Sequence, residues 1–148
     1  MGTNEADRRK IVAGIDGSPS SLAALEWAAR QADLTGSDLV VVGAWHLPST
    51  YAAAGISDDY DPASDMQRVL DHWLPEIQHA HHPLRVAGQV IESYPGPALV
   101  DASLDADLLV VGSRGHRELA DILLGSVGMY CATHAHYPVL VYRSDRDQ

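Results

Sequence analysis

Short apolar runs alternate with longer amphipathic segments along the chain. The run at Leu39–Trp45, LVVVGAW, is apolar at nearly every position, which is typical of a parallel strand that is covered on both faces. The run at Leu84–Glu92 instead alternates apolar and polar residues. The pattern predicts five strands, at Ile11–Ile15, Leu39–Trp45, Leu84–Glu92, Asp107–Val111 and Pro138–Tyr142.

Helix signals stand between these runs. Ser18 is placed to cap a helix that starts at Pro19, and Gly36 supplies its stop signal. Pro75 interrupts a second apolar stripe and predicts that this helix kinks or ends nearby, because proline removes a backbone hydrogen bond. The predicted helices start at Pro19, at Pro62, at Gly96 (ending at Leu104) and at about Ser126 (ending at Ala135).

The order of these elements favours a doubly wound α/β sheet with right-handed crossovers and helices on both faces. A chain of 148 residues is of single-domain size, so we expect one domain over 1–148, with a flexible leader at 1–9 and a tail at 144–148. The segment His46–Asp61 has no period and is predicted to be a surface loop.

Composition narrows the class of protein. The formal net charge of −10 disfavours binding to nucleic acid or to anionic membranes. No apolar run approaches membrane-spanning length, and Cys131 is the single cysteine, so we expect a soluble cytoplasmic protein in which Cys131 is a core residue. Lys10 is the sole lysine and precedes the first strand, which excludes chemistry that needs a lysine in a phosphate loop.

Two loops follow predicted strands with compositions that suggest a site. One begins at Gly14 and Asp16 after the first strand, and the other begins at Gly112 after the fourth strand, which ends at Val111. Ligands of open parallel sheets bind at the carboxyl ends of the strands. If these two strands are neighbours, both loops face one crevice.

The second loop has the properties of an anion site. Glycines at Gly112 and Gly115 allow backbone N–H groups to point inward, and Gly125 with Ser126 stands at a predicted helix N-terminus, which attracts phosphate. Spaced glycines mark either positive-φ turns or a close approach of the backbone to another group. Taken alone, these glycines are also typical of turns and helix caps.

The full spacing, G-x2-G-x9-G-S directly after DLLVV, resembles the signature of the universal stress protein family and of its nucleotide-binding branch. The similarity extends over nearly the whole chain, including IVAGIDGSPSSLAALEWAA, LVVVGAW, DADLLVVGSRG, LLGSVG and HYPVLVYR. The resemblance implies a five-stranded parallel sheet of order 3-2-1-4-5. It also implies a homodimer through the terminal strand Pro138–Tyr142, which would lie at a sheet edge.

The resemblance further implies that ATP binds with its adenine against the backbone of Ala44, with Asp16 near the ribose and a bound metal. A strongly acidic chain that binds a triphosphate needs Mg2+ to offset repulsion. Gly128 stands where the family often has a second hydroxyl residue. The predicted nucleotide-binding residues are Gly14, Asp16, Ala44, Val111, Gly112, Arg114, Gly115, Gly125, Ser126, Val127 and Gly128, with Asp16 also as the metal ligand.

Some of these residues have simpler interpretations. Asp16 alone is typical of a turn or cap carboxylate, and Arg114 and Arg117 are either phosphate partners or solvated loop residues. The histidines at 72, 79, 81, 82, 134 and 136 do not have the spacing of a metal site.

We therefore expect an ATP-binding regulatory protein that responds to stress through nucleotide occupancy and acts on an unknown protein partner. One alternative is an ATP-hydrolysing or nucleotidyl-transfer enzyme on a related α/β fold, and another is a partner-binding module that has lost its nucleotide. The loop GIDGSPSS lacks the paired glycines of a pyrophosphatase-type loop, which argues against the enzyme.

Overall fold

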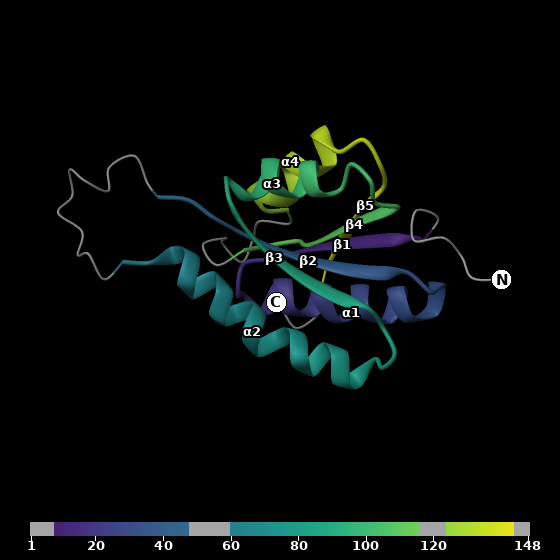
Figure 1. The fold of residues 1–148 in the computed structure, drawn as a ribbon. Helices are drawn as coiled ribbons and strands as arrows, with labels where there is room; N and C mark the ends of the chain where they lie inside the picture. Colours follow the sequence, from purple (N-terminus) through teal and green to yellow (C-terminus); the bar gives the residue numbers. More distant parts are fainter. Residues whose placement is uncertain (1–7, 48–59, 116–123, 144–148) are drawn as a thin grey trace.

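The computed structural model describes residues 8–47, 60–115 and 124–143, in which strands and helices alternate (Figure 1). The strands are β1 (Lys10–Ile15), β2 (Asp38–Trp45), β3 (Val86–Glu92), β4 (Leu108–Gly112) and β5 (Val139–Tyr142). The helices are α1 (Pro19–Thr35), α2 (Pro62–Ala80), α3 (Pro95–Ala102) and α4 (Ser126–His134). The strands are parallel in the order β3-β2-β1-β4-β5, which confirms the predicted fold.

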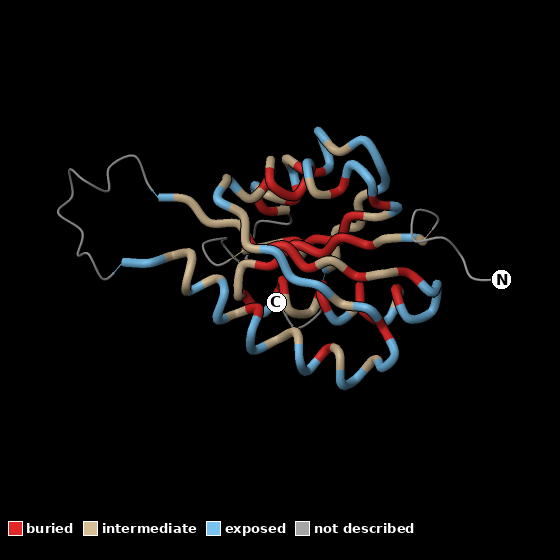
Figure 2. The backbone as a smooth tube through the Cα atoms, viewed as in Figure 1, coloured by how far each residue is buried: buried red, intermediate tan, exposed pale blue. Residues whose placement is uncertain are grey.

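The sheet lies between two helical layers, with α1 and α2 on one face and α3 and α4 on the other (Figure 1). Successive residues of β1 point to opposite faces, so Ile11 and Ala13 pack on the α1 side while Val12 packs on the α3 side. Figure 2 shows that buried residues are concentrated in the central strands. The parallel sheet is thus covered on both faces, as the uniformly apolar runs predicted.

Helix α1 begins and ends as its sequence signals predict. The Ser18 side chain accepts a hydrogen bond from the backbone N–H of Ser21 at 3.2 Å, and Pro19 occupies the first helical position. Gly36 ends the helix with a φ of 69°, a left-handed conformation that favours glycine. The Ser18 cap holds the start of α1 directly after β1, where the first candidate loop lies.

The sequence predicted that α2 either kinks or ends near Pro75. The helix does not end there, because it continues through Pro75 to Ala80. Pro75 is exposed, whereas Leu70 and Ile77 on either side of it are buried. Burial of the stripe on both sides of the proline holds the helix together, because tertiary packing outweighs local propensity.

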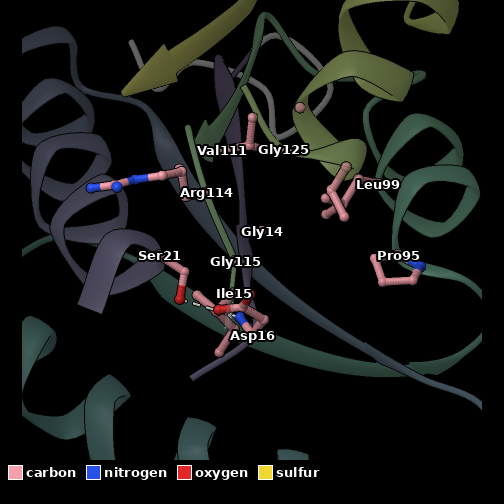
Figure 3. Close-up of a pocket in the computed structure, with 13 residues that line it drawn as sticks. Gly14, Ile15, Asp16, Ser21, Pro95, Leu99, Val111, Arg114, Gly115 and Gly125 are labelled. Carbon is pink, nitrogen blue, oxygen red and sulfur yellow. Dashed lines mark hydrogen bonds between the residues drawn. The ribbon is translucent and has the colours of Figure 1, made fainter. Parts of the chain in front are cut away.

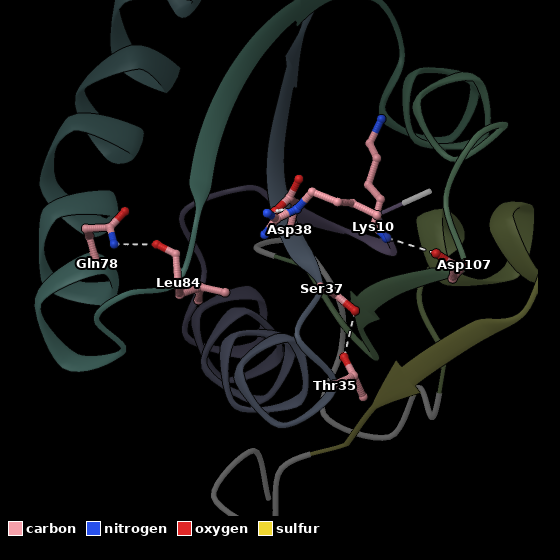
Figure 4. A network of polar contacts seen from close by, with 8 residues as sticks. Lys10, Thr35, Ser37, Asp38, Gln78, Leu84 and Asp107 are labelled. Carbon is pink, nitrogen blue, oxygen red and sulfur yellow. Dashed lines mark hydrogen bonds and ion pairs between the residues drawn. The ribbon is translucent and has the colours of Figure 1, made fainter. Parts of the chain in front are cut away.

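Polar contacts join the amino ends of the strands, opposite the candidate loops (Figure 4). The backbone N–H of Lys10 donates to Asp107 at 2.8 Å, and the Arg8 guanidinium pairs with Asp38 at 2.9 Å. The Lys10 ammonium pairs with Asp105 and, by its hydrogen bond, lowers the pKa of that carboxyl group. The sole lysine therefore lies at the end of the sheet that is remote from the candidate loops.

Cys131 is fully buried in the core between α4 and the sheet, as predicted, and burial raises the pKa of its thiol to about 11. No helix in the described part of the chain is long and apolar enough to cross a membrane. Most of the predicted leader, most of the His46–Asp61 loop and all of the 144–148 tail lie outside the described residues.

Candidate functional site

A crevice opens at the carboxyl ends of β1 and β4, which are hydrogen-bonded neighbours (Figure 3). The space that no atom fills between its walls is about 510 Å³, open solvent at the mouth included. The residues that line it are Gly14, Ile15, Asp16, Ser21, Pro95, Leu99, Val111, Gly112, Arg114, Gly115, Gly125, Val127 and Gly128.

The Asp16 carboxylate organises the turn between β1 and α1. Its Oδ1 atom accepts a hydrogen bond from the backbone N–H of Ser18 at 2.8 Å. The backbone N–H of Asp16 in turn donates to Ser21 Oγ at 3.2 Å. Asp16 is thus a turn residue in this structure, and the turn holds its carboxylate at the wall of the crevice.

Gly112 allows the loop after β4 to lie against the first turn of α1. A Cβ atom built on Gly112 would stand 2.6 Å from Ser20 Oγ and 2.9 Å from the backbone oxygen of Ser20. The backbone N–H of Arg114 also faces Ser20 Oγ, at 3.4 Å. Among the described residues, positive φ occurs only at Gly17 and Gly36, so backbone conformation does not require glycine at 112. The close approach of the loop to α1 is the structural requirement there.

Gly115 brings the two candidate loops together. A Cβ atom on Gly115 would stand 2.9 Å from Asp16 Oδ2, so the loop after β4 passes directly beside the turn after β1. The backbone N–H of Gly125 donates to the Ser113 carbonyl at 2.6 Å, which ties the start of α4 to the same loop. The backbone of both loops and the N-terminus of α4 therefore meet at one crevice.

Arg114 and Asp16 contribute the charged groups of the lining. In Figure 3 the side chain of Arg114 runs away from Pro95 and Leu99, so the crevice has a polar side and an apolar side. Arg114 and the first turn of α4, whose Val127 and Gly128 line the crevice, favour an anionic group on the first side. Pro95 and Leu99 suit an apolar ring on the second side.

Most predicted site residues line the crevice, but two do not. Ala44 lies in β2, opposite Ile91, and is not among the lining residues. Ser126 is exposed and lines a neighbouring groove between α3 and α4 instead. Arg117 lies outside the described residues.

Four lining residues were not among those predicted, namely Ile15, Ser21, Pro95 and Leu99. Ile15 and Leu99 read as core residues in the apolar pattern, and both are indeed buried. Ser21 lies three residues after the cap of α1, a position that directs its hydroxyl back towards Asp16. Pro95 begins α3, and proline is common at the first position of any helix.

No three His, Cys, Asp or Glu residues lie together in a metal-binding arrangement within 8–47, 60–115 and 124–143. His81 instead lies 3.9 Å from Asp33, and His134 stacks on Tyr130. Asp16 is the one carboxylate among the described residues that line the crevice, and Mg2+ prefers phosphate oxygens and water beside one or two carboxylates.

Comparison with known proteins places this geometry in a family. Residues 7–143 match the model of the universal stress protein family. The universal stress protein Rv2624c of Mycobacterium tuberculosis is 32% identical over an alignment of 154 residues, which covers 99% of this chain and 53% of the relative. The chain thus spans about half the length of this relative.

Solved structures show the same fold. A universal stress protein in complex with cAMP is 27% identical, with a TM-score of 0.69 over 90% of this chain and 96% of the other. Protein Rv1636 from Mycobacterium tuberculosis is 29% identical, with a TM-score of 0.57 over 92% of this chain and 95% of the other. The family model extends over nearly all described elements, so this chain belongs to the universal stress protein family.

Proposed function

We propose that this protein is a nucleotide-dependent regulator that binds ATP with Mg2+ in the crevice and acts through occupancy of the site rather than through rapid turnover. The observation that carries the proposal is the meeting of three features at one place: the Asp16 turn, the close-packed backbone at Gly112 and Gly115, and the start of α4. Backbone N–H groups at a helix N-terminus favour phosphate.

The related structure with bound cAMP supports a nucleotide as the ligand class. We propose ATP as the nucleotide because a phosphate chain directed to the loop at Gly115 and to the start of α4 would leave the base on the side of Pro95 and Leu99, all of which line the crevice. In this proposal the protein acts in the cytoplasm and its occupied state is recognised by a protein partner.

Calorimetric titration of the purified protein tests the proposal. We expect ATP with Mg2+ to bind at least about tenfold more tightly than cAMP, a difference of about 1.4 kcal/mol, because of the additional phosphate contacts. Tight binding of cAMP with no detectable binding of ATP would contradict ATP as the ligand. Phosphate release at about 1 per second or faster would show an ordinary enzyme instead.

Asp16 provides a test of the metal. Asp16→Asn retains an oxygen that accepts from the Ser18 N–H, so the turn should persist, but it removes the negative charge. We expect this variant to weaken binding of ATP with Mg2+ more than binding of metal-free ATP, and Asp16→Ala to behave likewise with an additional loss of thermal stability. Titrations with Mg2+ and with a chelator provide the comparison. Equal losses in both conditions would assign Asp16 to the turn alone.

A homodimer through β5 is the assembly that we propose. β5 lies at the edge of the sheet, and Val139–Tyr142 are only partly buried, so an apolar edge strand is offered to a second copy. We expect light scattering to report a dimer, and Leu140→Lys to shift it towards monomer. Leu34→Lys, at a leucine that is 84% exposed on α1, is the matched control and should leave the mass unchanged. A monomeric mass for the unaltered protein at micromolar concentration with ATP would contradict the dimer.

A further inference from the structure

A second groove adjoins the crevice on the outer side of α3 and α4. It is formed by Tyr94, Pro95 and Pro97 at the start of α3 and by Ser126, Val127 and Tyr130 of α4. Pro95 and Val127 line both the groove and the crevice, so the two spaces share a wall. We call this space the outer groove, and it holds about 600 Å³ that no atom fills, open solvent included.

Two tyrosine rings stand along the outer groove, and each is supported by a histidine. Tyr94 is 63% exposed as a residue, and its ring lies against His46, with ring centroids 4.3 Å apart. The Tyr130 ring stacks on His134 at 4.0 Å with an interplanar angle of 20°. Because each ring already has a neighbour, its orientation is restrained before any ligand arrives.

Gly96 lets α3 pack directly against one of these rings. A Cβ atom on Gly96 would stand 2.6 Å from Cδ1 of Tyr130, so glycine at this position permits the ring to lie under the first turn of α3. Among the described residues that line the outer groove there is no Lys, Arg, Asp or Glu. Its walls therefore suit an uncharged planar ring and not a phosphate group.

The position of the outer groove beside the crevice indicates how a planar ring could reach it. The start of α4 lies between them, since Gly125 lines the crevice, Ser126 lines the outer groove and Val127 lines both. A phosphate chain that begins in the crevice and passes over the start of α4 leads into the outer groove. A second base at the end of that chain would meet the exposed Tyr94 side chain, with Tyr130 as a wall of the groove.

We propose that the outer groove binds the second nucleoside of a dinucleoside polyphosphate, a ligand in which two nucleosides are joined through a chain of phosphates. The inference rests on the proposed function, because the first nucleoside and the phosphates occupy the ATP site. Stacking of a base on an aromatic side chain is worth about tenfold or more in affinity.

A ligand pair that differs only by the second adenosine tests the inference. Adenosine 5′-tetraphosphate and diadenosine tetraphosphate carry the same number of phosphates. We expect the diadenosine compound to bind at least about tenfold more tightly to the unaltered protein, which corresponds to one stacked base. Tyr94→Ala should remove this difference and change ATP affinity less than twofold, since Tyr94 does not line the crevice.

Tyr137→Ala is the matched control, because Tyr137 is also largely exposed, at 51%, and lines neither space. It should retain the preference for the diadenosine compound. Equal affinity for the two ligands, or a preference that survives Tyr94→Ala, would overturn the inference while leaving ATP binding intact. If Tyr94→Ala changes the molar mass in light scattering but not the affinity for either ligand, the outer groove is a contact between protein chains. That result would also overturn the inference. Failure of ATP itself to bind would overturn the proposed function and this inference with it.

Discussion

Gly115→Val is expected to lower ATP affinity by about tenfold or more, at least about 1.4 kcal/mol, while the apo protein remains folded. The Cβ atom would stand 2.9 Å from Asp16 Oδ2, and the two methyl groups beyond it would extend into the crevice. Gly115 does not have a positive φ, so valine imposes no left-handed strain on the backbone. The expected loss therefore concerns the ligand and not the fold.

Gly125→Val is a second variant of the same kind. Gly125 has extended backbone, with φ −73° and ψ 171°, a conformation that valine adopts readily. Gly36→Ala is the reciprocal control, because it strains a left-handed cap remote from the crevice and should lower the thermal midpoint without changing ATP affinity. Titration calorimetry and thermal unfolding of the apo proteins give both quantities. Unchanged ATP affinity in a folded Gly115→Val protein would falsify the phosphate-loop hypothesis.

Gly112→Ala is expected to destabilise the apo protein by about 1–3 kcal/mol, the usual cost of overpacking. The added Cβ would meet the backbone oxygen and carbon of Ser20 at 2.9 and 3.0 Å, and backbone atoms at the start of α1 cannot move aside as a side chain can. Removing the Ser20 hydroxyl relieves only part of the clash, so the double variant Gly112→Ala with Ser20→Ala should stay less stable than Ser20→Ala alone.

Gly88→Ala provides the comparison for this prediction. Its Cβ would meet Leu74 Cδ1 at 2.6 Å and Leu70 at 3.4 Å, and these are the far ends of flexible side chains rather than backbone atoms. We expect a smaller loss in the free energy of unfolding than for Gly112→Ala, because the leucine side chains can move aside. Denaturant unfolding with and without ATP gives the free energy of unfolding of both variants. Equal stability of Gly112→Ala and Gly88→Ala would refute the close contact between Gly112 and Ser20 as the reason for glycine there.

The sequence by itself determined the order and type of the elements. Uniformly apolar runs such as Leu39–Trp45 predicted parallel strands covered on both faces, because only such strands need apolar side chains on both sides. Ser18 and Gly36 marked the ends of α1, because helix caps depend on local residue type. Outside α2, the expected and observed boundaries differ by at most two residues. The candidate loops followed from the same pattern, since a loop that leaves a parallel strand must lie at its carboxyl end.

Only the tertiary structure decided what each site residue contacts. Gly112 requires glycine because of Ser20, a residue remote in sequence that is brought near by the packing of α1 beside β4. Leu99 reads as an ordinary core residue until α3 places it against Gly14, and Ser126 matches the signature yet faces the outer groove. Pro75 opposes a helix locally, but buried residues on both sides of it keep α2 intact. These contacts depend on which surfaces the folded chain brings together. The order of residue types along the chain does not specify the distances between residues that are remote in sequence.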